Sequence, residues 1–100
     1  MTVAALVGDL LDRSKIAAAM PDARFAAAPD ECAGAEAVVI DVKAHPEAVA
    51  AVRKIAPSAR IVAYGRHDDP GALDAARAAG ADVALPRSRF FLDPAATVQA

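Results

Sequence analysis

The sequence predicts an α/β protein in which five parallel strands form one sheet with helices on both faces. Short apolar runs alternate with helical patterns five times along the 100 residues, and this alternation implies a parallel sheet with right-handed crossovers. The most apolar run, Ala37 to Val42, places three consecutive β-branched residues directly before Asp41. Such a run is typical of a central strand that is buried on both faces.

The predicted strands are short apolar runs that end near turn residues. In chain order they are Thr2 to Val7, Arg24 to Ala28, Ala37 to Val42, Arg60 to Tyr64 and Asp82 to Leu85. The second run is the weakest, because Phe25 is its only large residue. The first run ends in Gly8-Asp9 and the fourth is closed by Gly65, as expected for turns at the ends of strands.

Helices are predicted where apolar residues recur three or four positions apart. They are Leu10 to Met20, a helix opened by His45-Pro46-Glu47 and ended by Pro57, a helix from Pro70 to its C-cap Gly80, and a short one from Asp93 to Gln99. Ala48, Val52 and Ile55 are predicted to form the buried face of the second of these. The segment from Pro29 to Ala35 lacks periodicity and forms at most one helical turn. These elements fit a flavodoxin-like doubly wound sheet of order 2-1-3-4-5. The helical elements after the second strand, Pro29 to Ala35, and after the last strand, Asp93 to Gln99, are short.

Composition limits the classes of function. A net charge of −2 and a pI of about 5.5 argue against binding to nucleic acids or anionic membranes. No segment approaches the roughly 18 apolar residues of a membrane span, and the N-terminal apolar run is too short for a signal peptide. The single cysteine, Cys32, excludes an internal disulfide and fits a reducing compartment. We therefore expect one small cytoplasmic domain.

The C-terminal half resembles a known signalling family. The segment Ala78 to Arg87, AAGADVALPR, resembles the EAGADDYLPK segment of response-regulator receiver domains, which are CheY-like proteins of bacterial two-component signalling. The run Ile61 to Gly65 resembles their fourth strand, and the strand that ends at Asp41 resembles the one that bears their phosphoacceptor aspartate. The resemblance implies a single receiver-like domain over residues 1–100.

The sequence departs from the family at the positions that carry phosphoryl chemistry and switching. Receivers place two adjacent acids after the first strand, whereas here the pair is Gly8-Asp9. The switch Ser or Thr corresponds to Gly65, the lysine after the fifth strand to Arg87, and the coupling aromatic to Ala84. These departures predict a degenerate receiver, or pseudo-receiver, that is not an enzyme and at most accepts a phosphoryl group on Asp41.

Asp41 is the candidate phosphoacceptor, and Asp9 with Asp41 is a candidate weak Mg²⁺ pair because hard cations prefer carboxylate oxygens. Arg87 could donate to the phosphoryl group in place of lysine, although its planar fork needs a different geometry. The alternative is that Asp41 caps the following turn. No cofactor other than Mg²⁺ is expected.

Two further groups of residues are candidates for binding. His45 and His67, with Asp68 and Asp69, follow strands and could hold a transition metal, although Asp69 could equally cap a helix. Arg87, Arg89, Phe90 and Phe91 follow the last strand and could form an apolar and cationic patch. For the two rings we predict that one lies in the core and one is partly exposed.

Three functions remain open from the sequence. The first is a non-catalytic module that acts through protein partners such as a histidine kinase or another signalling protein, or as a homodimer. The second is a working receiver that is phosphorylated on Asp41. The third, more weakly indicated, is a flavodoxin-like domain that binds a small ligand or a metal.

Overall fold

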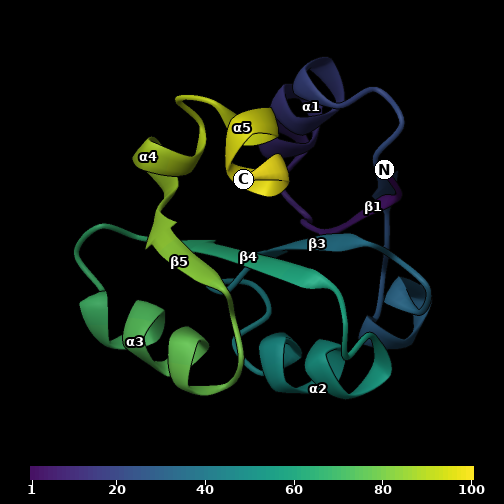
Figure 1. Ribbon diagram of the computed structural model, residues 1–100. Coiled ribbons are helices and arrows are strands. Elements are labelled where there is room, and N and C mark those ends of the chain that lie inside the picture. The colour runs from purple at the N-terminus through teal and green to yellow at the C-terminus, as the bar shows by residue number, and fades with distance from the viewer.

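The protein is a doubly wound α/β sandwich built on a five-stranded parallel sheet (Figure 1). The computed structural model describes residues 1–100. The strands are β1 (Val3–Leu6), β2 (Arg24–Phe25), β3 (Ala37–Asp41), β4 (Arg60–Gly65) and β5 (Val83–Pro86). Their order is β2-β1-β3-β4-β5 and every neighbouring pair is parallel. The predicted fold class and strand order are therefore confirmed.

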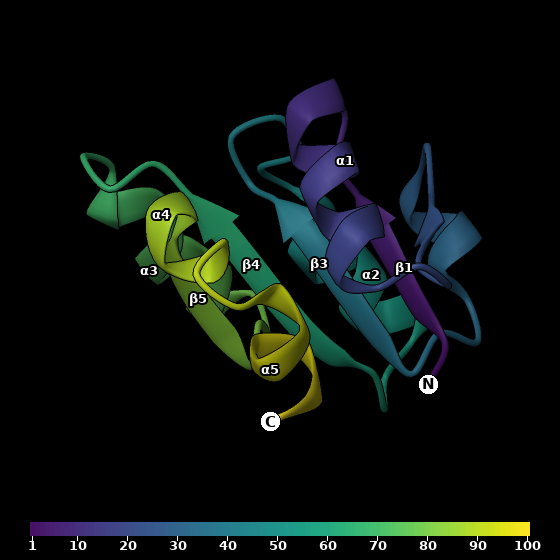
Figure 2. The same ribbon diagram turned by 90° about the horizontal axis from the view of Figure 1, so that it is seen from above.

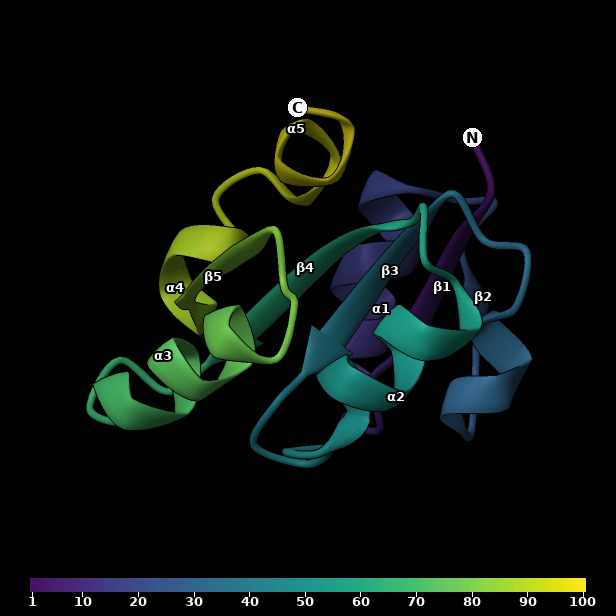
Figure 3. The same cartoon turned by 60° about the horizontal axis from the view of Figure 1, so that its bottom comes forward.

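Helices cover both faces of the sheet. They are α1 (Leu10–Ala19), the 3₁₀ helix η1 (Pro29–Cys32), α2 (Ala48–Ile55), α3 (Pro70–Ala78), α4 (Arg87–Phe90) and α5 (Pro94–Gln99). Figure 2 shows α1, α4 and α5 over one face, and Figure 3 shows α2 and α3 over the other. The second crossover holds only the single turn η1, as predicted. No helix has the length and apolar character that a bilayer crossing requires.

Strand β3 divides the core into two layers, because successive side chains of a strand point to opposite faces. Val38 and Ile40 pack in the layer beneath α2 and α3. Ala37 and Val39 pack in the layer beneath α1, α4 and α5. The predicted central position of this strand is confirmed, and Asp41 emerges at the carboxyl edge of the sheet.

Several predicted elements differ from the structure by one residue at an end, and β2 and α2 differ by more. Strand β2 stops at Phe25 because the N–H of Ala27 donates to Glu31 Oε2, at 3.3 Å, and the chain turns into η1. Helix α2 begins at Ala48, since the N–H of His45 first closes a turn onto the carbonyl of Asp41.

The buried face of α2 is also corrected. Ile55 is 38% exposed, whereas Val49 is buried together with Val52 and Ala56. These three positions are spaced i, i+3, i+7, so the helix is rotated relative to the face that the sequence predicted. Of the three residues expected on that face, Ala48 and Val52 are buried and Ile55 is not.

The segment after β5 forms two short helices in place of one. The unpredicted α4 follows Pro86 at once, and Asp93 then caps α5 by accepting a hydrogen bond from the N–H of Ala96 at 3.1 Å. Phe90 is fully buried and Phe91 only partly so, which confirms the prediction of one core ring and one partly exposed ring.

Candidate functional site

A polar cavity of about 250 Å³ lies at the carboxyl edge of the sheet, where the segments following β1, β3, β4 and β5 meet. It is lined by Asp9, Asp12, Asp41, Lys43, Tyr64, Gly65, Arg66 and Arg87. All three residues predicted for the site from sequence, Asp9, Asp41 and Arg87, therefore line one cavity. Ligands of open α/β sheets gather at this edge.

Asp41 ends β3 and shares a sheet face with Val39 and Tyr64, because side chains alternate along a strand and Asp41 pairs in register with Tyr64. Its Oδ1 accepts a hydrogen bond from the N–H of Lys43 at 3.0 Å. This is the turn-capping geometry that was the alternative to phosphoryl acceptance. The other carboxylate oxygen accepts no hydrogen bond from the chain and remains available to a ligand.

Asp9 is the N-cap of α1. Its backbone is extended, with φ −67° and ψ 126°, and its Oδ1 accepts a hydrogen bond from the N–H of Asp12 at 3.0 Å, as an N-cap aspartate does. Its second oxygen is also without a donor from the chain. Asp9 and Asp41 thus each use one oxygen to stabilise a turn, and each has a second oxygen that accepts no hydrogen bond from the chain.

Asp12 is the buried acid of this site, and the sequence did not predict it there. It is 2% exposed and is the only buried charged residue in the protein. Its Oδ2 accepts hydrogen bonds from Tyr64 Oη at 3.0 Å and Arg87 Nε at 3.2 Å, and its Oδ1 accepts one from Arg87 Nη2. Its spacing gave a signal, because Asp12 lies four positions before the buried Ile16 and so belongs to the inner face of α1.

Arg87 is bound to Asp12 and stacks on an aromatic ring. Its guanidinium carbon lies 5.0 Å from the centre of the Phe91 ring, a favourable cation–π distance. The hydrogen bonds to Asp12 raise the pKa of Arg87 above its usual range, so the guanidinium is permanently charged. The positive charge that sequence analysis assigned to phosphoryl binding is therefore already paired with a carboxylate.

Tyr64 joins this ion pair to the core. Its ring stacks on Phe90 at 5.0 Å with an interplanar angle of 7°, and meets Phe91 edge-on at 5.3 Å. Burial raises the pKa of the Tyr64 phenol well above its usual value, and the negative charges of Asp41 and Asp12 and the hydrogen bond to Asp12 act in the same direction. The phenol is accordingly a fixed, neutral donor to Asp12.

Gly65 and Ala84 are the residues that the sequence resemblance aligned with a switch hydroxyl and its coupling aromatic. A Cβ atom on Gly65 would lie 3.0 Å from Val42 Cγ2 and 3.3 Å from Leu73 Cδ2. That space is therefore already filled by core side chains. Ala84 is buried in the same layer as Val42 and Leu73, and no aromatic ring belongs to that layer.

The two histidines, His45 and His67, line different surface hollows. His45 lines a surface hollow beside Pro29 and α2, whereas His67 lines a different one together with Arg66 and Arg87. Arg66 binds Asp68 at 2.7 Å and 2.8 Å and lowers the pKa of that carboxyl to about 2.

The last acid of the predicted metal group, Asp69, caps α3 by accepting from the N–H of Ala72 at 3.2 Å. Nowhere do three His, Cys, Asp or Glu side chains lie in an arrangement that could hold a metal ion. The cap interpretation of Asp69 therefore has a matching hydrogen bond in the structure, and the metal interpretation has no matching cluster.

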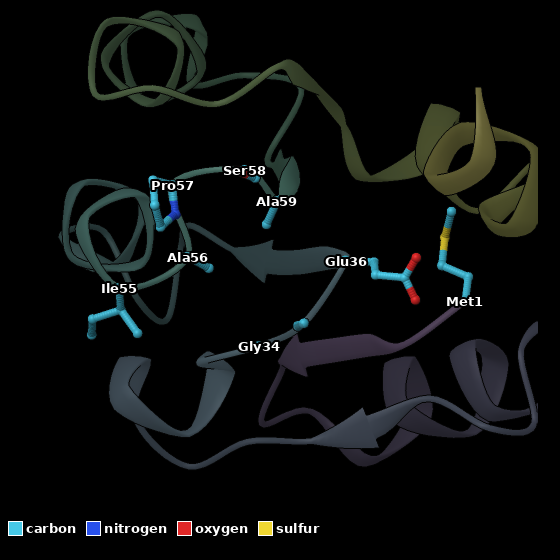
Figure 4. A pocket seen from close by; sticks show the side chains of 9 residues that line it. Met1, Gly34, Glu36, Ile55, Ala56, Pro57, Ser58 and Ala59 are labelled. Carbon is cyan, nitrogen blue, oxygen red and sulfur yellow. The ribbon is translucent and has the colours of Figure 1, made fainter.

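The largest hollow lies at the opposite, amino edge of the sheet (Figure 4). It measures about 500 Å³ and is formed by the segments Gly34 to Glu36 and Ile55 to Ala59 with Met1. Glu36 is its only ionisable side chain, and its Oε1 accepts from the N–H of Thr2 at 2.9 Å, which lowers the pKa of Glu36. The ionisable side chains that could bind an anion or a cation are concentrated at the carboxyl edge instead.

No protein-family model matches the chain, and no curated protein matches it in sequence. Several solved structures match the chain in fold. A response regulator from Burkholderia pseudomallei superposes with a TM-score of 0.74 at 15% identity over 86% of this chain and 59% of that one. A response regulator from Thermotoga maritima gives 0.71 at 14% identity over 86% and 83% of the two chains. A protein described as a CpaE2 pilus assembly protein, from Sinorhizobium meliloti, gives 0.64 at 15% identity over 99% and 95%.

The chain therefore has the flavodoxin-like fold of response-regulator receiver domains. It spans 59% of the length of the Burkholderia chain. At these identities the likeness extends to the fold, and a fold of this kind supports several functions. Function has to be argued from the cavity at the carboxyl edge.

Proposed function

We propose that this chain is a receiver-like signalling module that acts through protein partners in the bacterial cytoplasm and does not take up a phosphoryl group on Asp41. The observation that carries the proposal is the pairing of Arg87 with the buried Asp12. Transfer of a phosphoryl group to a carboxylate needs a cation that stabilises the moving oxygens. Here the cation at the position of the receiver lysine is committed to another acid.

Releasing Arg87 toward Asp41 would leave Asp12 as a buried carboxylate with Tyr64 as its only side-chain donor. Breaking one side of a buried ion pair costs on the order of 3–5 kcal/mol, and partial exposure of Arg87 lowers that figure. An incoming phosphoryl group would have to supply this energy before gaining any stabilisation of its own. The arrangement therefore disfavours both the transfer and the phosphorylated product.

The residues that would transmit a phosphorylation event are also replaced. Gly65 has no hydroxyl to bind a phosphoryl oxygen, and Ala84 has no ring to follow such a movement. The one tyrosine of the chain, Tyr64, is already buried and hydrogen-bonded to Asp12. A partner would therefore meet a surface that is the same whether or not a phosphodonor is present.

The test is incubation of the protein with acetyl phosphate and Mg²⁺, followed by intact mass spectrometry. We expect no mass increase of one phosphate. We also expect no change in oligomeric state, measured by light scattering, when beryllofluoride and Mg²⁺ are added. A phosphate adduct that disappears in Asp41→Ala would overturn the proposal.

A working receiver is the second candidate, and one observation favours it. Asp9 and Asp41 share their cavity with three cations, Lys43, Arg66 and Arg87, and each acid has an oxygen that could bind Mg²⁺. The similar Burkholderia response regulator is described with a phosphorylated aspartic acid and a calcium ion. The same mass measurement separates the candidates, because only a working receiver yields the adduct.

The partners that we propose are a histidine kinase or another signalling protein, with a homodimer as the alternative. Sedimentation velocity over a wide range of protein concentration tests the homodimer directly. A single monomeric species at every concentration would exclude the homodimer and leave a histidine kinase or another signalling protein as the partner.

A further inference from the structure

Asp12 is the buried acid on which the proposed function depends, and three hydrogen bonds are directed at its carboxylate. It lies on the inner face of the first turn of α1 and lines the same cavity as Asp41. Its donors come from two parts of the chain, Tyr64 from β4 and Arg87 from the first residue of α4, directly after β5. Burying a charge costs free energy unless the charge is paired, and these hydrogen bonds pair the carboxylate of Asp12. The pairing has a consequence for Arg87.

The consequence concerns the orientation of Arg87. The carboxylate of Asp12 accepts from both Nε and Nη2, which is the two-point geometry that fixes a guanidinium most firmly. The side chain of Arg87 is nevertheless 44% exposed, so core packing alone does not immobilise it. The charge of Asp12, together with the Phe91 ring at 5.0 Å, holds the guanidinium.

Arg87 and Asp41 line one cavity, so Asp41 is among the residues that a guanidinium released from Asp12 can approach. The other two cations of the cavity are differently placed. Arg66 is held by Asp68, which does not line the cavity, and Lys43 forms no ion pair from which its ammonium could be released. Arg87 is therefore the cation whose release would change anion binding at Asp41 most.

We propose that Asp12 is a positioning residue that holds Arg87 away from Asp41, and that removing its charge gives the cavity affinity for a phosphoryl-like anion on Asp41. This inference rests on the proposed function, in which the unaltered protein does not bind such an anion. Asp12 thereby competes with the ligand for one guanidinium.

The probe is beryllofluoride with Mg²⁺, and the signal is the bound resonance in fluorine NMR together with calorimetric affinity. The variant is Asp12→Asn, which keeps an amide oxygen as acceptor for the Tyr64 hydroxyl while removing the charge that binds Arg87. We expect no binding by the unaltered protein, and an affinity of the variant at least about tenfold above the upper limit that the measurement sets for the unaltered protein. The signal should vanish in the double variant Asp12→Asn, Asp41→Ala.

The matched control is Asp74→Asn. Asp74 pairs with Arg77 on the surface of α3 at 2.9 Å and its side chain is 77% exposed, so the variant removes the same charge from an acid–arginine pair away from the cavity. No gain in beryllofluoride binding is expected there. A gain equal to that of Asp12→Asn would show that net charge alone governs binding and would overturn the inference.

Folding of Asp12→Asn is checked by its melting curve. If it does not fold, Asp12→Leu with Tyr64→Phe replaces both polar partners by apolar ones, which buried polar groups often tolerate, and the same gain is expected. The unaltered protein supplies a test that needs no variant at position 12, namely the NMR signal of Arg87 Nε–H, identified by its loss in Arg87→Lys. Slow exchange and hindered rotation are expected, and a freely rotating guanidinium would overturn the inference.

The outcomes distinguish the two proposals. If the unaltered protein binds beryllofluoride through Asp41, the proposed function fails. If neither the unaltered protein nor the folded Asp12 variant shows a bound beryllofluoride resonance, this inference fails while the proposed function stands.

Discussion

Ile40 offers the most direct test of the central position of β3. The side chain is fully buried beneath α2 and α3, and its register partners are Leu6 on β1 and Ala63 on β4. Alanine is common in this layer, which also holds Ala4, Ala48, Ala76 and Ala84. Alanine side chains have no rotamers with which to fill a space, so the alanines of this layer can close a gap only by moving with the backbone.

The magnitude for Ile40→Ala follows from this setting. The change removes three carbon atoms, which at about 0.8 kcal/mol each gives about 2.4 kcal/mol of lost transfer free energy. The cavity that remains adds about 1 kcal/mol. The free energy of unfolding should therefore fall by about 3–4 kcal/mol, a large part of the 5–15 kcal/mol that is typical of native proteins.

Urea denaturation followed by circular dichroism measures this loss, and thermal melting should show a fall in Tm of at least about 12 °C. The matched control is Ile55→Ala, the same substitution at a site on α2 that is 38% exposed, where the loss should stay below about 1 kcal/mol. Equal losses in the two variants, or a loss below about 1 kcal/mol for Ile40→Ala, would refute the placement of the two side chains.

Three further predictions concern charged and ionisable groups. Arg53→Ala should lower the free energy of unfolding by about 1–3 kcal/mol in urea melts, because the Gly80 carbonyl loses donors at 3.1 Å and 2.7 Å, and Arg53→Lys should recover only part of that loss. Partial burial opposes ionisation of Asp82, but hydrogen bonds from the Ile61 N–H and Arg53 lower its pKa overall. Its stabilising contribution is thus complete above the unfolded-state pKa and is lost as pH falls through the folded-state pKa, so the unfolding free energy of Asp82→Asn should depend less on acid pH than that of the unaltered protein. The raised pKa of Tyr64 gives the opposite sign, a contribution complete below the unfolded-state pKa and lost at alkaline pH. Tyrosinate absorbance should appear only together with unfolding, and an earlier, separate ionisation would contradict the buried hydrogen bond.

The order of the sheet could be predicted from sequence because the signals for it are local. Ala37 to Ile40 is apolar at every position, which only a strand covered on both faces requires. Turn residues mark the strand ends, and right-handed crossovers leave few arrangements for five parallel strands. The same reasoning placed Asp9, Asp41 and Arg87 at one edge, since every parallel strand ends there.

The rotation of α2 was not predictable to the same degree. Its sequence AVAAVRKI is apolar at several adjacent positions, so two neighbouring faces satisfy the helical period. The packing of β3 and β4 beneath it decides between them, and it selects Val49 over Ile55. That choice depends on tertiary contacts which a single helical pattern does not contain.

The pairing of Asp12 with Arg87 was hidden for a different reason. The two residues are 75 positions apart, and an acid in the first turn of a helix is ordinarily explained by the helix dipole. Only the i, i+4 relation between Asp12 and Ile16 indicates that the carboxylate faces inward. Its partner then depends on how the chain leaves β5, where no sequence pattern indicates the short helix α4.

The departures from the receiver pattern lie on both faces of the sheet, and this separates anion binding from switching. On the side of α1 and α4, Asp12 binds the guanidinium that an anion on Asp41 would need. On the side of α2 and α3, Val42 and Leu73 fill the space beside Gly65 where a switch side chain would begin. A change at position 12 acts on the first face only, because the second is closed by core packing. We therefore expect an Asp12 variant that binds an anion at Asp41 to keep α3 and β5 in one conformation. The surface that this variant presents to a partner should not change.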